Sequence, residues 1–449
     1  MTDPWWSQLC EGEKDRLLES ALLADPELDA RLRTQHRASA GDVTELRELV
    51  DDMLRTRRYL DWRQTREYAD DAWPVVQALA NAADSAASTE LVELVQRALS
   101  HVLKVLHRAD DDGLIGDVFD RLLDVHVRAC RQAGPDQSRL AKWLIKATYD
   151  DDWFSPPDPV PYADALGEKG VALYRQAAER ELSAVDGTDR YATGLSHGRY
   201  AVERLAVIDR DADAVVASFD HIERAGYRET EIASALREIG RDDLALAHAR
   251  AGLADAGPYD QRRLAPIADA ILSESGDAEG LLGLRRVHHQ LLPDRTTYAA
   301  LRDASTALHR WDDDRPAAIV ALGRTSPGEL IVVLLAEGKV DEAWSTYRAA
   351  ETVSFHEKDE LALIAARGVD HPGDALDAYL RLADAELVNT GRDHYERAIH
   401  LLKKGVEPAA RSGREADLRA HIEQLRATYK NRPTLIALLD RAALDRPRS

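Results

Sequence analysis

The feature that most constrains this chain is a local pattern that recurs between Gly240 and Gly413. Each copy has an apolar helical segment, a glycine or polar turn, and a second segment rich in Ala and Leu. The intervals Gly240 to Gly276, Gly338 to Gly373 and Gly373 to Gly413 are 36, 35 and 40 residues, and Gly276 to Gly338 is 62, about two periods. This period is typical of helix-hairpin arrays, whose units bury their apolar faces only by stacking on one another.

One segment of the repeat region is ambiguous between strand and helix. Residues 330–335 read Leu-Ile-Val-Val-Leu-Leu, and a run of this kind would suit a buried strand. It stands directly before Gly338, in the first-helix position of a copy. The sequence therefore predicts a buried helix there, and no other part of the chain has a strand pattern.

The N-terminal half has strong helical periodicity. From Leu91 to Leu106 the apolar residues fall on one stripe of a helix, with Ser88 as its N-cap and a polar turn at 110–113. A strong break follows at 150–161, because four prolines in six residues remove backbone donors that a helix needs. The helices expected around these features span residues 13–23, 26–35, 43–57, 65–83, 88–106, 115–133 and 137–149, and helix resumes near 162.

These patterns predict an all-α fold. Residues 1–187 form an N-terminal helical domain, and residues 188–449 form a TPR-like helical repeat array, an α-solenoid of helix hairpins. The boundary is placed at residues 186–189, a polar segment with the sequence Asp-Gly-Thr-Asp. Architecture of this kind supports binding surfaces more often than reaction centres.

Composition narrows the class further. No run approaches the ~20 apolar residues that a membrane-spanning helix needs, and the start has no secretory signal pattern. Only Cys10 and Cys130 are present, which excludes a disulfide framework and a four-cysteine zinc site. We expect a cytoplasmic protein without membrane contact and without a cofactor. Its net charge of −21 repels nucleic acid at long range, although residues 403–449 are locally basic.

Four stretches resemble an uncharacterised bacterial helical domain, the one that forms the C-terminal region of many SWIM zinc-finger proteins. The residues that carry the resemblance are Arg57 to Arg63 with Tyr68-Ala69; Asp111 to Asp117 with His126, Cys130, Pro135-Asp136 and 140–144; Asp151 to Trp153 with 162–167 and Tyr174-Arg175; and 425–440 with Tyr429 to Leu435.

The resemblance implies a helical repeat scaffold of unknown activity, sometimes fused to a finger that contacts nucleic acid. A SWIM finger needs Cys-x-Cys followed by Cys-x-His, and two isolated cysteines cannot supply it. Zinc-dependent DNA binding is therefore not carried over. Nucleic acid would be contacted only indirectly, through a partner, or through the basic C-terminal face.

Three motifs partly resemble catalytic or metal-binding motifs, but each lacks an essential feature. Residues 194–198, Gly-Leu-Ser-His-Gly, match the nucleophile elbow of α/β hydrolases but lack the preceding strand, so a loop between helices is expected. Asp209, Asp211 and Asp213 resemble a calcium loop without its glycine and glutamate, so these aspartates are expected to cap the helix that begins near Ala212. His126 and Cys130 share a helix face but lack a third zinc ligand.

Two sets of residues remain as candidate contact sites. Around the proline-rich break, Asp150, Asp151, Asp152, Trp153 and Tyr162 are candidates for a peptide or ligand contact, although aromatic residues there also suit simple locking of the loop.

Near the C-terminus, Arg426, Lys430 and Arg432 are candidates for an anion or nucleic-acid contact, with a solvated helix face as the alternative. No catalytic and no metal-binding residue is assigned. The leading hypothesis is a non-enzymatic scaffold that binds another protein along the groove of the array. The alternative is an accessory subunit of a nucleic-acid-acting complex that contacts phosphate through the basic C-terminal face. An enzyme has no supporting set of residues.

Overall fold

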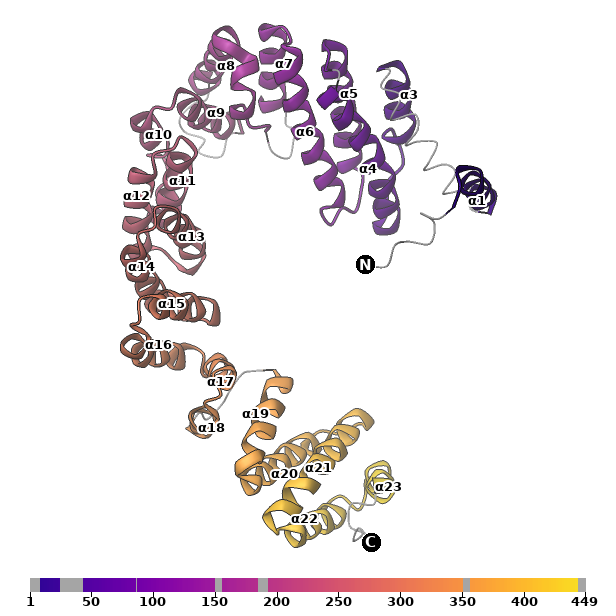
Figure 1. Ribbon diagram of the computed structural model, residues 1–449, viewed down its shortest axis with the longest axis vertical. Coiled ribbons are helices and arrows are strands. Elements are labelled where there is room, and N and C mark those ends of the chain that lie inside the picture. Colours follow the sequence, from indigo (N-terminus) through magenta and orange to yellow (C-terminus); the bar gives the residue numbers. More distant parts are fainter. Residues whose placement is uncertain are drawn as a thin grey trace. The chain divides into compact units, whose positions relative to one another are not determined.

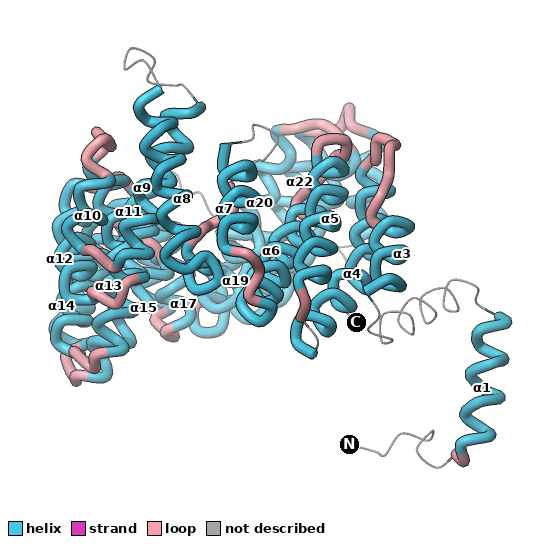
Figure 2. The backbone as a smooth tube through the Cα atoms, turned by 90° about the horizontal axis from the view of Figure 1, so that it is seen from above, coloured by secondary structure: helices cyan, strands magenta, loops and turns pink. Residues whose placement is uncertain are grey.

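The structure, a computed structural model, describes residues 9–24, 43–85, 87–149, 156–184, 193–349 and 356–442. Within these ranges the chain forms 22 α-helices and one short 3-10 helix, and the only pairing of β type is an isolated bridge between Leu60 and Ala109. Figures 1 and 2 show helices joined by turns and loops. The all-α helical-repeat prediction is confirmed.

Bounds of the helices are as follows: α1 Glu11–Ala24, α3 Val43–Met53, α4 Trp62–Ser85, α5 Thr89–Leu106, α6 Leu114–Ala133, α7 Gln137–Tyr149, the 3-10 helix η2 Val160–Tyr162, α8 Ala163–Ala184, α9 Thr193–Asp209, α10 Ala212–Ser218, α11 Ala225–Glu238, α12 Asp242–Asp255, α13 Pro258–Glu274, α14 Ala278–Leu291, α15 Arg295–Ala307, α16 Trp311–Thr325, α17 Pro327–Ala336, α18 Val340–Ala349, α19 Glu357–Asp370, α20 Pro372–Val388, α21 Arg392–Ser412, α22 Glu415–Thr428 and α23 Pro433–Ala442.

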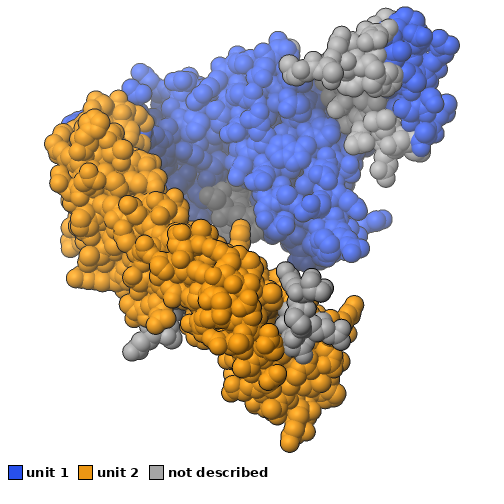
Figure 3. Space-filling view, turned by 60° about the horizontal axis from the view of Figure 1, so that its bottom comes forward, with its two compact units in different colours: residues 1–224, 234–244 blue, residues 225–233, 245–449 orange. Residues whose placement is uncertain are grey.

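The chain divides into two compact units (Figure 3). Unit 1 comprises Met1–Arg224 and Ser234–Leu244, and unit 2 comprises Ala225–Ala233 and Ala245–Ser449. The expected domain boundary at 187 and 188 falls in 185–192, outside the described residues, and stays a prediction. Helices α8 and α9, which flank that segment, pack on each other within unit 1.

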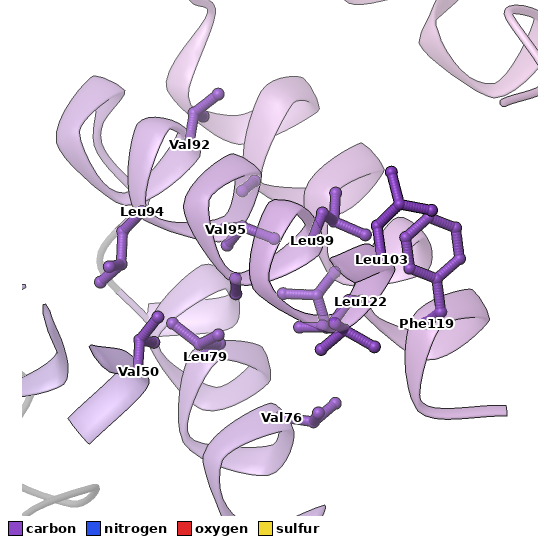
Figure 4. Close-up of a cluster of buried hydrophobic side chains, with 14 of the residues drawn as sticks. Val50, Val76, Leu79, Val92, Leu94, Val95, Leu99, Leu103, Phe119 and Leu122 are labelled. Carbon is purple, nitrogen blue, oxygen red and sulfur yellow. The ribbon is translucent and has the colours of Figure 1, made fainter. Parts of the chain in front are cut away.

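The core of unit 1 forms because its helices carry apolar stripes. Figure 4 shows Val50 from α3, Val76 and Leu79 from α4, and residues of α5 and α6 converging in one interior. Leu99 on α5 is 1% exposed and Leu122 on α6 is 0% exposed. Burial of such side chains stabilises the fold by roughly 1.5–3 kcal/mol each. Ser88 caps α5 as predicted, because its hydroxyl oxygen accepts the Leu91 amide at 3.2 Å.

Unit 2 has the serial packing expected of a repeat array. Each helix from α13 to α21 contacts the next one along the chain, α14 also contacts α16, and α23 contacts α21. One cluster of buried apolar residues runs from Leu282 on α14 to Leu439 on α23, and a smaller cluster reaches Leu284 on the same helix. The two clusters meet at α14, and within each of them a hairpin is stabilised by its neighbours.

A shared turn closes the first helix of many hairpins. Gly240, Gly276, Gly338 and Gly413 have φ between 67° and 77°, and the amide of the following residue bonds the carbonyl five positions earlier, as Lys339 does to Leu334 at 2.8 Å. This is the pattern of a left-handed helix C-cap. His309 (φ 57°) and Arg210 (φ 55°) form the same turn without glycine. The turn at His309 divides the double interval between Gly276 and Gly338 into its two periods.

Arginine–carboxylate pairs link neighbouring hairpins of unit 2. Three of them join the second helices of successive hairpins: Arg286 on α14 pairs with Asp314 on α16 at 2.8 Å, Arg315 on α16 pairs with Glu342 on α18 at 3.1 Å, and Arg414 before α22 pairs with Asp377 on α20 at 2.9 Å. Most of these side chains are partly exposed, so each pair adds at most about 1 kcal/mol. Their main effect is to fix how successive hairpins align.

Four local predictions differ from the structure or fall outside it. Residues 194–198, predicted as a loop, lie in α9. Gly373 does not form a turn, because it follows Pro372 at the start of α20 and the chain turns at His371 instead. The helix expected at 43–57 ends at Met53, and the helix expected at 26–35 lies outside the described residues. The helix predicted at 330–335 is confirmed as α17, and the Asp211 cap is confirmed by bonds from the Asp213 and Ala214 amides.

Candidate functional site: a groove along helix α6

A cavity in unit 1 follows the outer face of α6. This helix begins after Gly113 (φ 109°), and the Asp111 carboxylate caps it by accepting the amides of Ile115 and Gly116 at 3.0 and 3.1 Å. Its fully buried stripe packs on α4 and α5. Leu123 and Val127 lie beside that stripe, half-buried, and they form part of the floor of the groove.

The second wall comes from the proline-rich segment. Pro157, Asp158 and Pro161 face α6 across the groove. The segment is held in place by two arginines: Arg204 donates to both carboxylate oxygens of Asp158 at 2.9 and 2.8 Å, and Arg131 Nε donates to the Pro161 carbonyl at 3.0 Å. Proline fixes φ, and Pro161 lies in the short 3-10 helix η2, so the backbone of this wall has little freedom to change shape.

The groove encloses about 550 Å³ and combines an apolar floor with charges of both signs at its rim. The rim carries Asp120 and Asp124, while Arg121 pairs loosely with Asp124 at 3.5 Å. Arg128 is engaged by Asp84 at 2.9 Å. Desolvation, followed by the nearby charges of Asp117 and Asp124, raises the pKa of the Asp120 carboxyl. A cation from a bound partner would relieve this crowding of negative charge.

Beneath the floor lies a buried aromatic network. His126 Nδ1 lies 2.9 Å from the Tyr162 hydroxyl, and its Nε2 lies 3.1 Å from the Gln96 amide nitrogen. The Trp143 ring packs at 4.4 Å from the His126 ring. Burial lowers the pKa of His126 to about 3, and burial raises the pKa of the Cys130 thiol to about 12. The imidazole is therefore neutral with both nitrogens engaged, and the thiol keeps its proton. These groups form a structural network that positions Tyr162, and they do not form a nucleophile with its base.

The structure places only one member of the first candidate set. Asp150, Asp151, Asp152 and Trp153 lie outside the described residues. Tyr162 is 2% exposed and lines the α6 groove at its edge. The groove residues Leu123, Val127 and Arg131 do not stand out in the sequence, because an outer helix face beside a core stripe looks the same whether or not a loop covers it. Their spacing of four residues, next to the proline-rich segment, is the signal that was available.

The second candidate set is not assembled into one site. Arg426 pairs with Asp440 on α23, and Lys430 is exposed in the turn after α22. Arg432 Nη1 donates to the carbonyls of Leu387 and Asn389 at 2.7 and 3.2 Å. Its guanidinium also stacks 4.4 Å from the centre of the Tyr429 ring. Two of the three cations therefore already have partners within unit 2, and the anion contact stays a prediction.

These contacts allow a structural role of Arg432 to be tested separately from a phosphate-binding role. We expect Arg432→Ala to lower the free energy of unfolding by about 1–3 kcal/mol, because two carbonyls at the end of α20 lose a charged donor. Lys430→Ala, the matched exposed control, should leave it unchanged within about 0.5 kcal/mol. Urea unfolding followed by circular dichroism measures both values. Equal free energies of unfolding for the two variants would contradict a structural role of Arg432.

Within the described residues no three His, Cys, Asp or Glu side chains are grouped as metal ligands. None of the described helices combines the length and apolar character that crossing a membrane requires.

No family model matches the chain, and no curated protein matches it. Two solved structures are similar at 13% identity. The first, described as a circular tandem repeat protein with novel repeat topology and enhanced subunit contact surfaces, covers 92% of this chain and 93% of its own, with a TM-score of 0.18. The second, the APC/C hetero-tetramer Cut9–Hcn1, covers 85% of this chain and 92% of its own, with a TM-score of 0.19. These TM-scores are too low to support an argument, so the fold assignment rests on the helices and contacts described above.

Proposed function

We propose that this protein is a non-enzymatic scaffold that binds a partner protein, and that the groove along α6 takes an extended segment of that partner. The observation that carries the proposal is the groove itself: a preformed volume of about 550 Å³ between α6 and the proline-rich wall, apolar below and charged at the rim. A concave apolar site with a few directed polar groups is the usual form of a binding site.

The chemistry of the lining fits a peptide. An aliphatic side chain of the partner would occupy the floor at Leu123 and Val127, removing both from water. The Asp120 and Asp124 carboxylates would accept amide hydrogens or a cationic side chain, and the Arg131 guanidinium would donate to peptide carbonyls. Because Asp120 lies near two further carboxylates, a basic residue beside the aliphatic one is favoured.

The scaffold role agrees with the remaining structure. The two buried clusters and the arginine pairs of unit 2 support a stiff array, since each hairpin is held by its neighbours. The titratable residues near the α6 groove lack a nucleophile next to an available base, because Cys130 is buried and His126 is fully engaged. The acidic charge of the whole chain, −21, favours basic partners.

The test uses charge and shape changes in the groove. Val127→Asp places a carboxylate on the floor and should weaken partner binding at least about tenfold, because the buried aliphatic contact is worth roughly 1.5–3 kcal/mol. The measurement is affinity purification of the tagged full-length protein with quantitative mass spectrometry, followed by calorimetry with the protein recovered.

Two further variants make the result specific. Asp120→Arg alters the exposed rim of the groove without changing the core, and it should also weaken the binding of a basic partner. Val320→Asp adds the same charge at an exposed apolar residue of unit 2, 53% exposed, and should leave binding unchanged. Retention of the partner by both groove variants, or equal loss with Val320→Asp, would contradict the proposed function.

A further inference from the structure

A second groove lies in unit 2, where α23 packs against α21. It encloses about 410 Å³. On α21 it is lined at positions i, i+3, i+4 and i+7, and on α23 at i, i+3 and i+4, so a single stripe of each helix forms each wall. The residues are Glu396, Ile399, His400, Lys403, Leu438, Arg441 and Ala442.

The charges of this second groove are mostly positive and available. Lys403 and Arg441 are exposed, and no ion pair of the described residues includes either of them. Glu396, the carboxylate that lines the groove, pairs with Arg392 at 2.8 Å, and Asp440, next to Arg441 in the sequence, pairs with Arg426.

The floor between these cations is apolar. Ile399 is 6% exposed, and Leu438 is half-buried on the opposite wall. His400 is exposed and also lines the groove. The groove therefore offers a small apolar contact with a cation on each helix, which matches an aliphatic side chain flanked by carboxylates.

We propose that the groove between α21 and α23 binds an acidic segment of a partner protein, with the carboxylates of that segment on Lys403 and Arg441 and an aliphatic side chain against Ile399 and Leu438. This site is separate from the α6 groove, since its residues belong to unit 2 and it selects the opposite charge.

An acidic peptide fits the site better than nucleic acid does. Duplex DNA carries a negative charge every ~1.7 Å, and a chain of net charge −21 repels such a polymer along its whole length. Two or three carboxylates on a short segment carry much less charge than such a polymer, so they meet Lys403 and Arg441 with less of this long-range repulsion.

The test selects peptides without assuming a sequence. A phage-displayed library of twelve-residue peptides is panned on the full-length protein and counter-selected on the double variant Lys403→Glu/Arg441→Glu. We expect the surviving peptides to carry at least two Asp or Glu beside an aliphatic residue. A fluorescent synthetic copy should bind the wild type at least about tenfold more tightly than the double variant, and binding should weaken as salt is raised.

A matched control keeps the total charge change constant. Lys339→Glu/Arg324→Glu reverses two exposed cations of unit 2 outside the groove and should leave peptide binding within about twofold of wild type. The conservative variant Lys403→Arg/Arg441→Lys should retain it. Absence of any peptide specific for the wild type, recovery of peptides without acidic residues, equal loss in the control variant, or displacement of the peptide by a single-stranded oligonucleotide at lower concentration would each overturn the proposal.

The experiments distinguish a failure of the proposed acidic-peptide site from a failure of the proposed α6 site. The Lys403→Glu/Arg441→Glu variant should retain the partner that depends on Val127, because the α6 groove is unchanged.

Discussion

Replacing Leu122 by alanine should lower the free energy of local unfolding in α4, α5 and α6 by about 3 kcal/mol, within the usual range of 2–5 for a buried leucine. Leu122 is 0% exposed, and α6 packs on both α4 and α5, so truncation leaves a cavity that three helices border (Figure 4). Hydrogen exchange followed by mass spectrometry measures the opening of these helices directly.

The neighbouring residue provides the control for this prediction. Leu123→Ala removes the same atoms from a half-buried position in the α6 groove, and it should change the opening free energy by less than about 1 kcal/mol. Helices α19 to α21 belong to unit 2 and should exchange as in the wild type in both variants. A Leu122→Ala effect no larger than that of Leu123→Ala would show that the assigned interior of unit 1 is wrong.

Acidification should destabilise unit 1 through His126. Burial lowers the pKa of this histidine to about 3 from its ordinary value of 6.5, so the unfolded chain takes up a proton below pH 6.5 while the folded chain does not. Stability is therefore full above pH 6.5 and falls by about 1.4 kcal/mol per pH unit between pH 6.5 and 3. Between pH 6.5 and 5 the expected loss is about 2 kcal/mol.

His126→Gln isolates this contribution, because glutamine keeps a polar side chain without titrating in this range. Urea unfolding of both proteins at pH 7, 6 and 5 measures the difference. The groups around the ring, Tyr162, Gln96, Trp143 and Cys130, are uncharged between pH 7 and 5, so they do not mask the effect. Parallel pH dependences of the two proteins would show that His126 is not held neutral by burial.

Much of the scaffold follows from local sequence signals. The glycine turns at 240, 276, 338 and 413 and the run 330–335 locate the hairpins correctly, since left-handed caps favour glycine. The turns at Arg210 and His309 have no such signal, because neither residue is the glycine that marks a left-handed cap in a sequence. The prediction of a turn at Gly373 was wrong for the opposite reason, because a glycine at the start of a helix looks like a turn glycine in the sequence.

Site residues were harder to predict than helices. Arg432 reads as an exposed cation in sequence, yet it bonds carbonyls that lie more than forty residues away. The α6 groove needs the proline-rich segment to lie across a helix face, and hydrophobic periodicity contains no information on such a long-range contact. The resemblance to the C-terminal region of SWIM zinc-finger proteins stays a prediction.

Site-specific photo-crosslinking tests the central claim most directly. A benzophenone amino acid replaces Val127 in the floor of the α6 groove or, as a control, the exposed Val320 of unit 2. Irradiation in cells, followed by peptide mapping, should give one main protein adduct at position 127, through a short segment with an aliphatic and a basic residue, and no such adduct at position 320. Absence of an adduct at 127, or the same adducts at both positions, would contradict a scaffold that holds its partner in this groove.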